Sequence, residues 1–130
     1  MEKIISGAAE MTWDPDTRLV VLRFTSEANL TGRNAQELIA AISQWVGTEG
    51  KPFALLGDGG KLSGLDAEYR QNWTKFFSAH RKDAYIAFFN MNPFIRVAAE
   101  MFRLGSGIQL KAFADENEAR AWLRDKGIAA

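Results

Sequence analysis

The chain has 130 residues, no formal net charge and 47% hydrophobic residues. This length suits one domain with one core, and the composition argues against intrinsic disorder. The balanced charge disfavours nucleic-acid binding, and the absence of cysteine excludes disulfides, thiolate metal sites and thiol catalysis. We expect a single cytoplasmic domain over residues 1–130, since neither a signal peptide nor a membrane-spanning apolar stretch is visible.

The first half of the chain is predicted to form a hairpin, a helix and a buried strand. Apolar and β-branched residues in 8–13 and 18–24 flank an Asp-Pro-Asp-Thr turn, which is typical of a hairpin. A helix is expected from Asn34, as N-cap with Glu37 as its reciprocal partner, to about Val46. Gly47 can end this helix in a left-handed conformation. The apolar run 53–57 then predicts a short strand.

The second half alternates helices with strands. We expect a helix from about Asp66 to Ala79, capped by Ser63 or Asp66, and then a strand over 85–89. Residues 108–113 alternate as in a strand that is exposed on one face near a sheet edge. The last helix is predicted to start at Asp115, with Glu118 completing a capping box.

A third helix is predicted to start at Asn92 and Pro93, because proline loses no intrahelical hydrogen bond at the first helical position. Its inward stripe is expected to consist of Phe94, Val97, Ala98, Met101 and Phe102. Together these elements predict an α/β fold with a mixed central sheet of about five strands, an N-terminal β-hairpin and about four helices.

The C-terminal half also carries a family resemblance. It rests on Ile86-Ala87-Phe88-Phe89-Asn90, Asn92-Pro93-Phe94-Ile95-Arg96-Val97, Ala99-Glu100-Met101-Phe102 and the run from Leu110 to Leu123. These motifs resemble the SpoIIAA-like proteins, also described as STAS/SEC14-like, and the element order resembles the STAS fold of anti-sigma-factor antagonists. The resemblance implies a bacterial protein that binds or signals rather than catalyses. Its SEC14 connection implies a lipid-like ligand as an alternative.

The glycine-rich loop after residues 53–57 is the first candidate binding site. Ligands of open α/β sheets favour the crevice beyond the carboxyl ends of the strands, and glycine lets the backbone approach a ligand closely. The candidate ligand-binding or partner-binding residues are Asp58, Gly59, Gly60, Lys61, Ser63, Asn90 and Asn92. The simpler interpretation is a glycine-rich turn in which Ser63 caps the next helix. In STAS antagonists a serine in this region is phosphorylated, but the Asp-Ser-Ser-Gly type of motif is absent here.

Two aromatic stripes form the second candidate site. They consist of Tyr69, Trp73, Phe76 and Phe77 on one helix and of Phe94, Met101 and Phe102 on another. Stripes at helical spacing are usually core. If the core is underfilled, the same side chains would line an apolar pocket, and if they are exposed they would form a partner surface or a homodimer interface.

Reactive side chains are few. His80 is the only histidine, and because no orienting partner or nucleophile stands beside it, we expect it to interact with the last carbonyls of its helix. No metal or cofactor is expected. We therefore interpret the chain as a non-catalytic STAS-like binding or signalling module that recognises a protein partner or a small ligand. A carrier or sensor of a lipid-like apolar molecule is the alternative, and a small enzyme using loop 58–63 ranks last.

Overall fold

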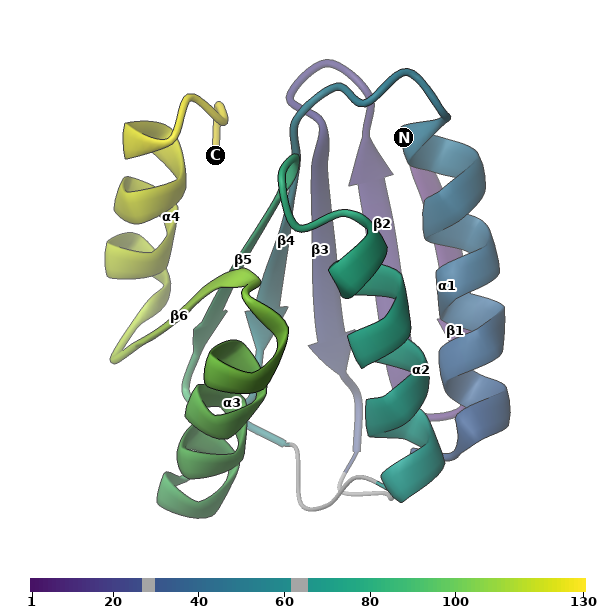
Figure 1. Ribbon diagram of the computed structural model, residues 1–130, viewed down its shortest axis with the longest axis vertical. Helices are drawn as coiled ribbons and strands as arrows, with labels where there is room; N and C mark the ends of the chain where they lie inside the picture. Colours follow the sequence, from purple (N-terminus) through teal and green to yellow (C-terminus); the bar gives the residue numbers. More distant parts are fainter. Residues whose placement is uncertain (27–29, 62–65) are drawn as a thin grey trace.

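The computed structural model describes residues 1–26, 30–61 and 66–130, without the side chains at positions 94, 98, 102, 105 and 106. Within this part, six strands lie side by side in chain order and four helices accompany them (Figure 1). The strands are Glu2–Ser6 (β1), Ala9–Asp14 (β2), Leu19–Phe24 (β3), Phe53–Asp58 (β4), Ala84–Phe89 (β5) and Gln109–Phe113 (β6). The helices are Gly32–Val46 (α1), Ala67–Ala79 (α2), Pro93–Ser106 (α3) and Glu116–Asp125 (α4).

The predicted α/β class and mixed sheet are confirmed, with one strand more than expected. The additional strand is β1, which pairs antiparallel with β2. Its five residues contain only two apolar side chains, Ile4 and Ile5, and these are adjacent rather than alternating. The sequence therefore carries no strand periodicity at this point.

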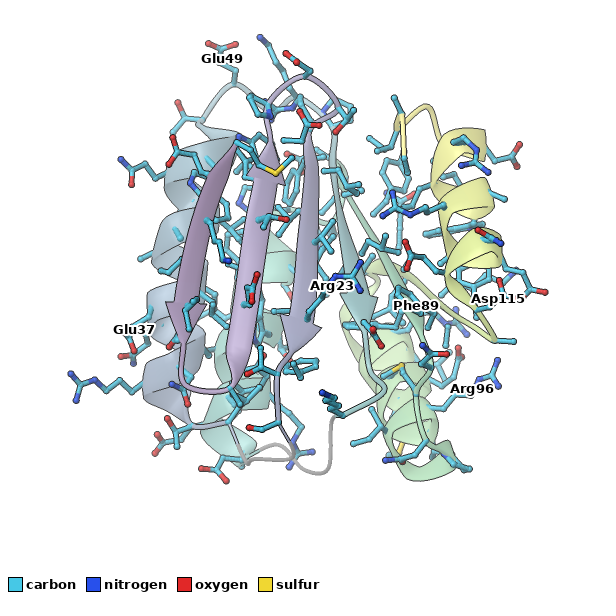
Figure 2. The ribbon with its side chains drawn as sticks, turned by 180° about the vertical axis from the view of Figure 1, so that it is seen from behind. Arg23, Glu37, Glu49, Phe89, Arg96 and Asp115 are labelled. Carbon is cyan, nitrogen blue, oxygen red and sulfur yellow. The ribbon has the colours of Figure 1, made fainter. Side chains whose placement is uncertain are left out.

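The direction of the strands determines where the helices lie. The pairs β1–β2 and β2–β3 are antiparallel, whereas β3, β4, β5 and β6 are all parallel. Each parallel connection passes through a helix, and such crossovers are right-handed, so α1, α2 and α3 lie on the same face of the sheet (Figure 1). The fourth helix, α4, packs on the opposite face (Figure 2).

Two hydrophobic clusters result from this arrangement. The larger one lies between the sheet and the helices α1, α2 and α3, and includes Met11, Leu38 and Leu55. The smaller one lies under α4, where Ala119 and Leu123 pack on the sheet. Figure 2 shows that α4 covers only one side of its face and leaves β1 and β2 without a helix over them.

Helix α1 begins three residues earlier than the sequence predicted. The N-cap is Thr31, whose hydroxyl accepts a hydrogen bond from the Asn34 backbone N–H at 3.4 Å, while the Asn34 side-chain oxygen accepts the Thr31 N–H at 3.0 Å. The side chain of Ser6 explains why Asn34 and Glu37 take other roles. Its hydroxyl accepts from the Asn34 amide and donates to the Glu37 carboxylate, both at 3.0 Å, and so ties α1 to β1.

The other helix ends follow the sequence more closely. The side chains of Asn92 and Asp115 accept the N–H groups of Ile95 and Glu118, each at 2.9 Å, so both predicted N-caps are confirmed. The reciprocal bond from the Glu118 side chain, which would complete the predicted capping box, is not formed among the described residues. Asp66 occupies the N-cap position of α2 but makes no side-chain cap hydrogen bond within the described residues, and Ser63, the other predicted cap, lies outside them. Gly47 ends α1 with a positive φ of 73°, but its ψ of −166° is not left-handed helical.

The predicted inward stripe of α3 is wrong for two of its members. Val97 and Met101 are 60% and 69% exposed, and Leu104, which continues their row, is 73% exposed. Ile95 and Ala99 face the large core cluster instead. The helix has apolar residues on more than one side, so periodicity alone did not identify the buried one. The side chains of Phe94, Ala98 and Phe102 are not described.

In the part of the chain that the structure describes, α4 is the one helix on its face of the sheet, so its buried leucine should contribute strongly to the free energy of unfolding. Leu123 is fully buried, so we expect Leu123→Ala to lower the free energy of unfolding by about 2–5 kcal/mol. The matched control is Leu104→Ala on exposed α3, which should change it by less than about 0.5 kcal/mol. Urea unfolding followed by circular dichroism measures both. Equal losses in the two variants would contradict this assignment of the core.

Candidate functional site

The loop after β4 is held together by its own polar groups. Asp58 accepts hydrogen bonds from the Gly60 backbone N–H at 3.0 Å and from the Asn90 amide at 3.5 Å. The N–H of Gly59 donates to the carbonyl of Phe89 at 2.8 Å. Asn90, with a positive φ of 59°, turns the chain at the end of β5. The structure thus brings Asp58, Gly59, Gly60 and Asn90 together as predicted, but in a turn stabilised from within.

Arg23 uses the remaining side of Asp58. It comes from β3 and lies on the α4 side of the sheet (Figure 2). Its guanidinium lies 3.4 Å from the Asp58 carboxylate and 3.8 Å from that of Glu116, which in turn binds Arg120 at 2.8 Å. This chain of charges links β3, β4 and α4. It gives the Asp58 carboxylate a structural role.

The other predicted loop residues do not extend this cluster. Asn92 caps α3 through its side-chain oxygen. Lys61 is exposed at the end of the described segment. Ser63 lies outside the described residues, so its role as a binding residue or as a helix cap stays a prediction.

A cleft of about 470 Å³ lies on the opposite face of the sheet, between α2 and α3. Strand residues form its floor: Leu22, Phe24, Leu55, Ile86, Phe88 and Leu110. The walls include Tyr69, Trp73 and Phe77 from α2 and Ile95, Ala99 and Met101 from α3, together with Met91. Ala67, Arg70, Gln71 and Thr74 complete the lining from α2. Most of the surface that a ligand would meet is therefore apolar.

Four residues of the predicted aromatic site line this cleft, namely Tyr69, Trp73, Phe77 and Met101. Phe76 does not line it and is buried, with its ring centroid 5.1 Å from that of Phe77. Phe94 and Phe102, the other two predicted residues, have side chains that lie outside the described part of the structure. The predicted aromatic residues are thus divided between the closed core, which holds Phe76, and the lining of the cleft.

A glycine in β4 shapes the floor of the cleft. Gly57 stands opposite Leu22 on one side and Phe88 on the other, and a Cβ atom at Gly57 would collide with the ring of Phe88. The missing side chain therefore lets the Phe88 ring lie over the sheet, in the cleft lining. The neighbouring Gly59 has a different reason, since its Cβ would lie 2.7 Å from Cγ of Met91.

The polar atoms of the aromatic wall are buried with it. Desolvation by burial raises the pKa of Tyr69 well above its ordinary value and outweighs the opposing effect of a polar contact with Trp73, so the phenol stays neutral. That contact does not reach hydrogen-bonding geometry. The indole N–H of Trp73 has no acceptor among the described residues. The rings of Trp73 and Phe77 are stacked with centroids 5.3 Å apart.

His80 does have a neighbour that the sequence analysis missed. It follows α2 and its Nδ1 lies 3.4 Å from the Asp83 carboxylate. Its ring packs against Phe53 and Phe76, with centroid distances of 5.5 and 4.7 Å, rather than against the last helix carbonyls. An orienting carboxylate is therefore present, but no hydroxyl is hydrogen-bonded to the imidazole in the described part of the chain.

Within residues 1–26, 30–61 and 66–130, histidine, aspartate and glutamate side chains do not gather in threes at metal-binding distances. No helix of these segments has both the length and the apolar character needed to cross a bilayer.

Sequence reasoning missed the floor of the cleft and its polar rim. The floor residues come from four strands, and only strand register brings them together. The rim carried a signal, because Arg70 and Thr74 each directly follow an aromatic position of the α2 stripe. On a helix, the residues next to a buried stripe lie at the edge of any cavity that the stripe lines.

The comparisons with known proteins point to one family and one fold. The model of the family described as SpoIIAA-like matches residues 21–124. An uncharacterised DUF3478-family protein with a SpoIIAA-like fold from Shewanella loihica PV-4 superposes with a TM-score of 0.69 at 18% identity, over 95% of this chain and 98% of that chain. A search of the curated proteins found no significant match.

Two other similar structures have described roles. SiaC from Pseudomonas aeruginosa, in its apo form, gives a TM-score of 0.65 at 12% identity over 88% of this chain and 100% of that chain. SiaC has also been solved in complex with the diguanylate cyclase SiaD and is described there as its activator. The murine anion transporter Slc26a9 gives a TM-score of 0.60 at 16% identity over 83% of this chain and 18% of the transporter. At these identities the likeness concerns the fold.

The glycine in the cleft floor can be tested by adding one methyl group. Gly57→Ala should lower the free energy of unfolding by about 1–3 kcal/mol, because the Phe88 ring must move. Gly60→Ala is the matched control in the adjacent loop, where the new Cβ would lie 3.2 Å from an Asp58 oxygen, a much smaller overlap than that between a Gly57 Cβ and the Phe88 ring at 2.4 Å. We expect Gly60→Ala to lower the free energy of unfolding, measured with urea, by less than about 1 kcal/mol. A neutral effect of Gly57→Ala would mean that Phe88 does not lie over this position.

Proposed function

Because the chain belongs to the SpoIIAA-like family, we propose that it is a non-catalytic binding and signalling module whose binding site is the cleft between α2 and α3. The observation that carries the proposal is the cleft itself, which is large, open and mainly apolar. Its polar competitor, the loop after β4, supports the same conclusion. The Asp58 carboxylate there already binds Gly60, Asn90 and Arg23.

The proposed ligand is a small apolar molecule. The cleft volume of about 470 Å³ falls within the range of about 300–1,000 Å³ that is usual for small-molecule sites. Aromatic and aliphatic side chains occur in both the walls and the floor, and covering them with an apolar ligand would stabilise the complex by about 25 cal/mol for each Å² of apolar surface removed from water. A carrier or a sensor would use the cleft in the same way, and the two roles differ only in whether a partner protein reads the occupied state.

A neutral fluorescent probe tests the site directly. N-phenyl-1-naphthylamine should bind the purified chain with increased fluorescence, and Met101→Lys should weaken it about tenfold by placing a charge in the apolar wall. Leu104→Lys is the matched control, because Leu104 is equally exposed on the same helix but does not line the cleft. Its affinity should equal that of the wild type. No binding, or equal weakening by both lysines, would refute the cleft as the site.

A protein partner is the second candidate, and a different observation favours it. Val97, Met101 and Leu104 follow one another at spacings of four and three residues, so they form one exposed apolar row on α3, which we term the α3 ridge. Exposed apolar rows of this kind mark interaction surfaces. The ridge joins the cleft at Met101. SiaC, which shares the fold, is described as an activator in complex with its target enzyme.

The partner that fits this ridge is a protein with an exposed apolar surface. Affinity purification from the native cells should recover a protein with the wild type and with Lys75→Gln, an exposed α2 variant away from the cleft, but not with Leu104→Lys. The recovered protein must then bind again when both components are pure. Native mass spectrometry that instead found a homodimer abolished by Leu104→Lys would replace the partner by a second copy of this chain. Binding that Leu104→Lys leaves unchanged would overturn the ridge.

A further inference from the structure

We propose that the cleft ligand is a single-chain amphiphile with an anionic head group, and that Arg70 is the residue that binds this head. The inference rests on the proposed function and adds the chemical class of the ligand. It starts from the composition of the cleft lining. Among the described residues that line the cleft, Arg70 is the only one with a charged side chain.

The Arg70 side chain is exposed, and its charge has no carboxylate partner in the part of the chain that the structure describes. No carboxylate of the described residues lies within 4.0 Å of its guanidinium, the limit for an ion pair. Arg23, Arg103 and Arg120 each pair with a carboxylate, and Arg18 donates to backbone carbonyls. Arg33, Arg81 and Arg96 also lack a carboxylate partner among the described residues, but they do not line the cleft, so Arg70 is set apart by its position. A guanidinium that lines an otherwise apolar cleft can bind a carboxylate or phosphate through two parallel hydrogen bonds.

Two polar neighbours surround Arg70 on the same helix. Gln71 is exposed and its amide can donate a further hydrogen bond to an anionic head. Thr74 already donates its hydroxyl hydrogen to the Arg70 backbone carbonyl at 2.8 Å, so it can only accept. The donors of the cleft rim are thus provided by Arg70 and Gln71. Together they favour a group that accepts hydrogen bonds and carries negative charge.

The rest of the cleft determines the other end of the ligand. Its floor and walls are aliphatic and aromatic, and a carboxylate moved into them would lose its hydration without a counter-ion. An anionic amphiphile avoids this cost by placing its chain over Leu55, Ile86 and Leu110 and keeping its head at the rim. A cationic amphiphile would meet the Arg70 charge with the same sign. A neutral one would bind through its chain alone.

The experiment compares three probes: decanoate, 1-decanol and decyltrimethylammonium. The alkyl chain of decanoate is one methylene shorter than the other two, because its tenth carbon is the carboxylate, so tighter binding of decanoate cannot come from its chain. Isothermal titration calorimetry of the full chain, below micelle-forming concentrations, gives each dissociation constant. The wild type should bind decanoate about fivefold more tightly than decanol, as expected for one solvent-accessible ion pair, and decyltrimethylammonium most weakly. The preference should shrink as salt rises from about 0.05 M to about 0.5 M, because exposed charges are screened.

The variants separate the head group from the chain. Arg70→Gln should abolish the preference for decanoate while leaving the affinity for decanol unchanged. Lys75→Gln, which removes a positive charge from the same helix outside the cleft, should behave as the wild type. Equal binding of decanoate and decanol by the wild type, or equal losses in the two variants, would overturn the role of Arg70 and leave the cleft intact. Absence of binding for all three probes would refute the proposed function as well.

Discussion

The handedness of three crossovers is the constraint on which the rest of this molecule depends. Strands β3 to β6 are parallel and adjacent in chain order, so each connecting helix must lie on the same face of the sheet. Along this face α1 and α2 pack closely against each other, whereas α3 packs mainly on the edge strand β6 and makes few contacts with α2. The cleft occupies the space that this spacing leaves above β3 to β6. It is therefore a product of the topology.

The two faces of the sheet consequently differ in the role of their polar groups. On the α4 face, Arg23 connects the loop after β4 to Glu116, and the charged groups there act as links between elements. On the other face the polar groups are few and lie at the rim of an apolar space. This division is why the glycine-rich loop, the first of the two candidate sites in the sequence, is a weaker candidate than the cleft between α2 and α3. A carboxylate that is already paired has little capacity left for a ligand.

Much of the fold could be predicted from the sequence, because its signals are local. The caps of α3 and α4 depend on Asn92 and Asp115 within a few residues, and the helices and five of the strands follow from periodicity. Strand β1 was missed because it lacks that periodicity. Asn34 and Glu37 were misassigned because their partner, Ser6, lies about thirty positions away in the sequence. The exposed side of α3 was missed for a similar reason, since only the packing on β6 selects among its apolar sides.

The aromatic stripe of α2 could be identified, but its role could not. Tyr69, Trp73 and Phe77 would fill a closed core or line an open cleft, and the difference is the distance between α2 and α3, which no local pattern encodes. The most direct test is an amide chemical-shift titration of the isotopically labelled protein with decanoate. The account predicts shifts confined to α2, the inner side of α3 and the adjoining residues of β3 to β6. Shifts clustered at Asp58–Lys61 or under α4, with none in the cleft, would contradict it.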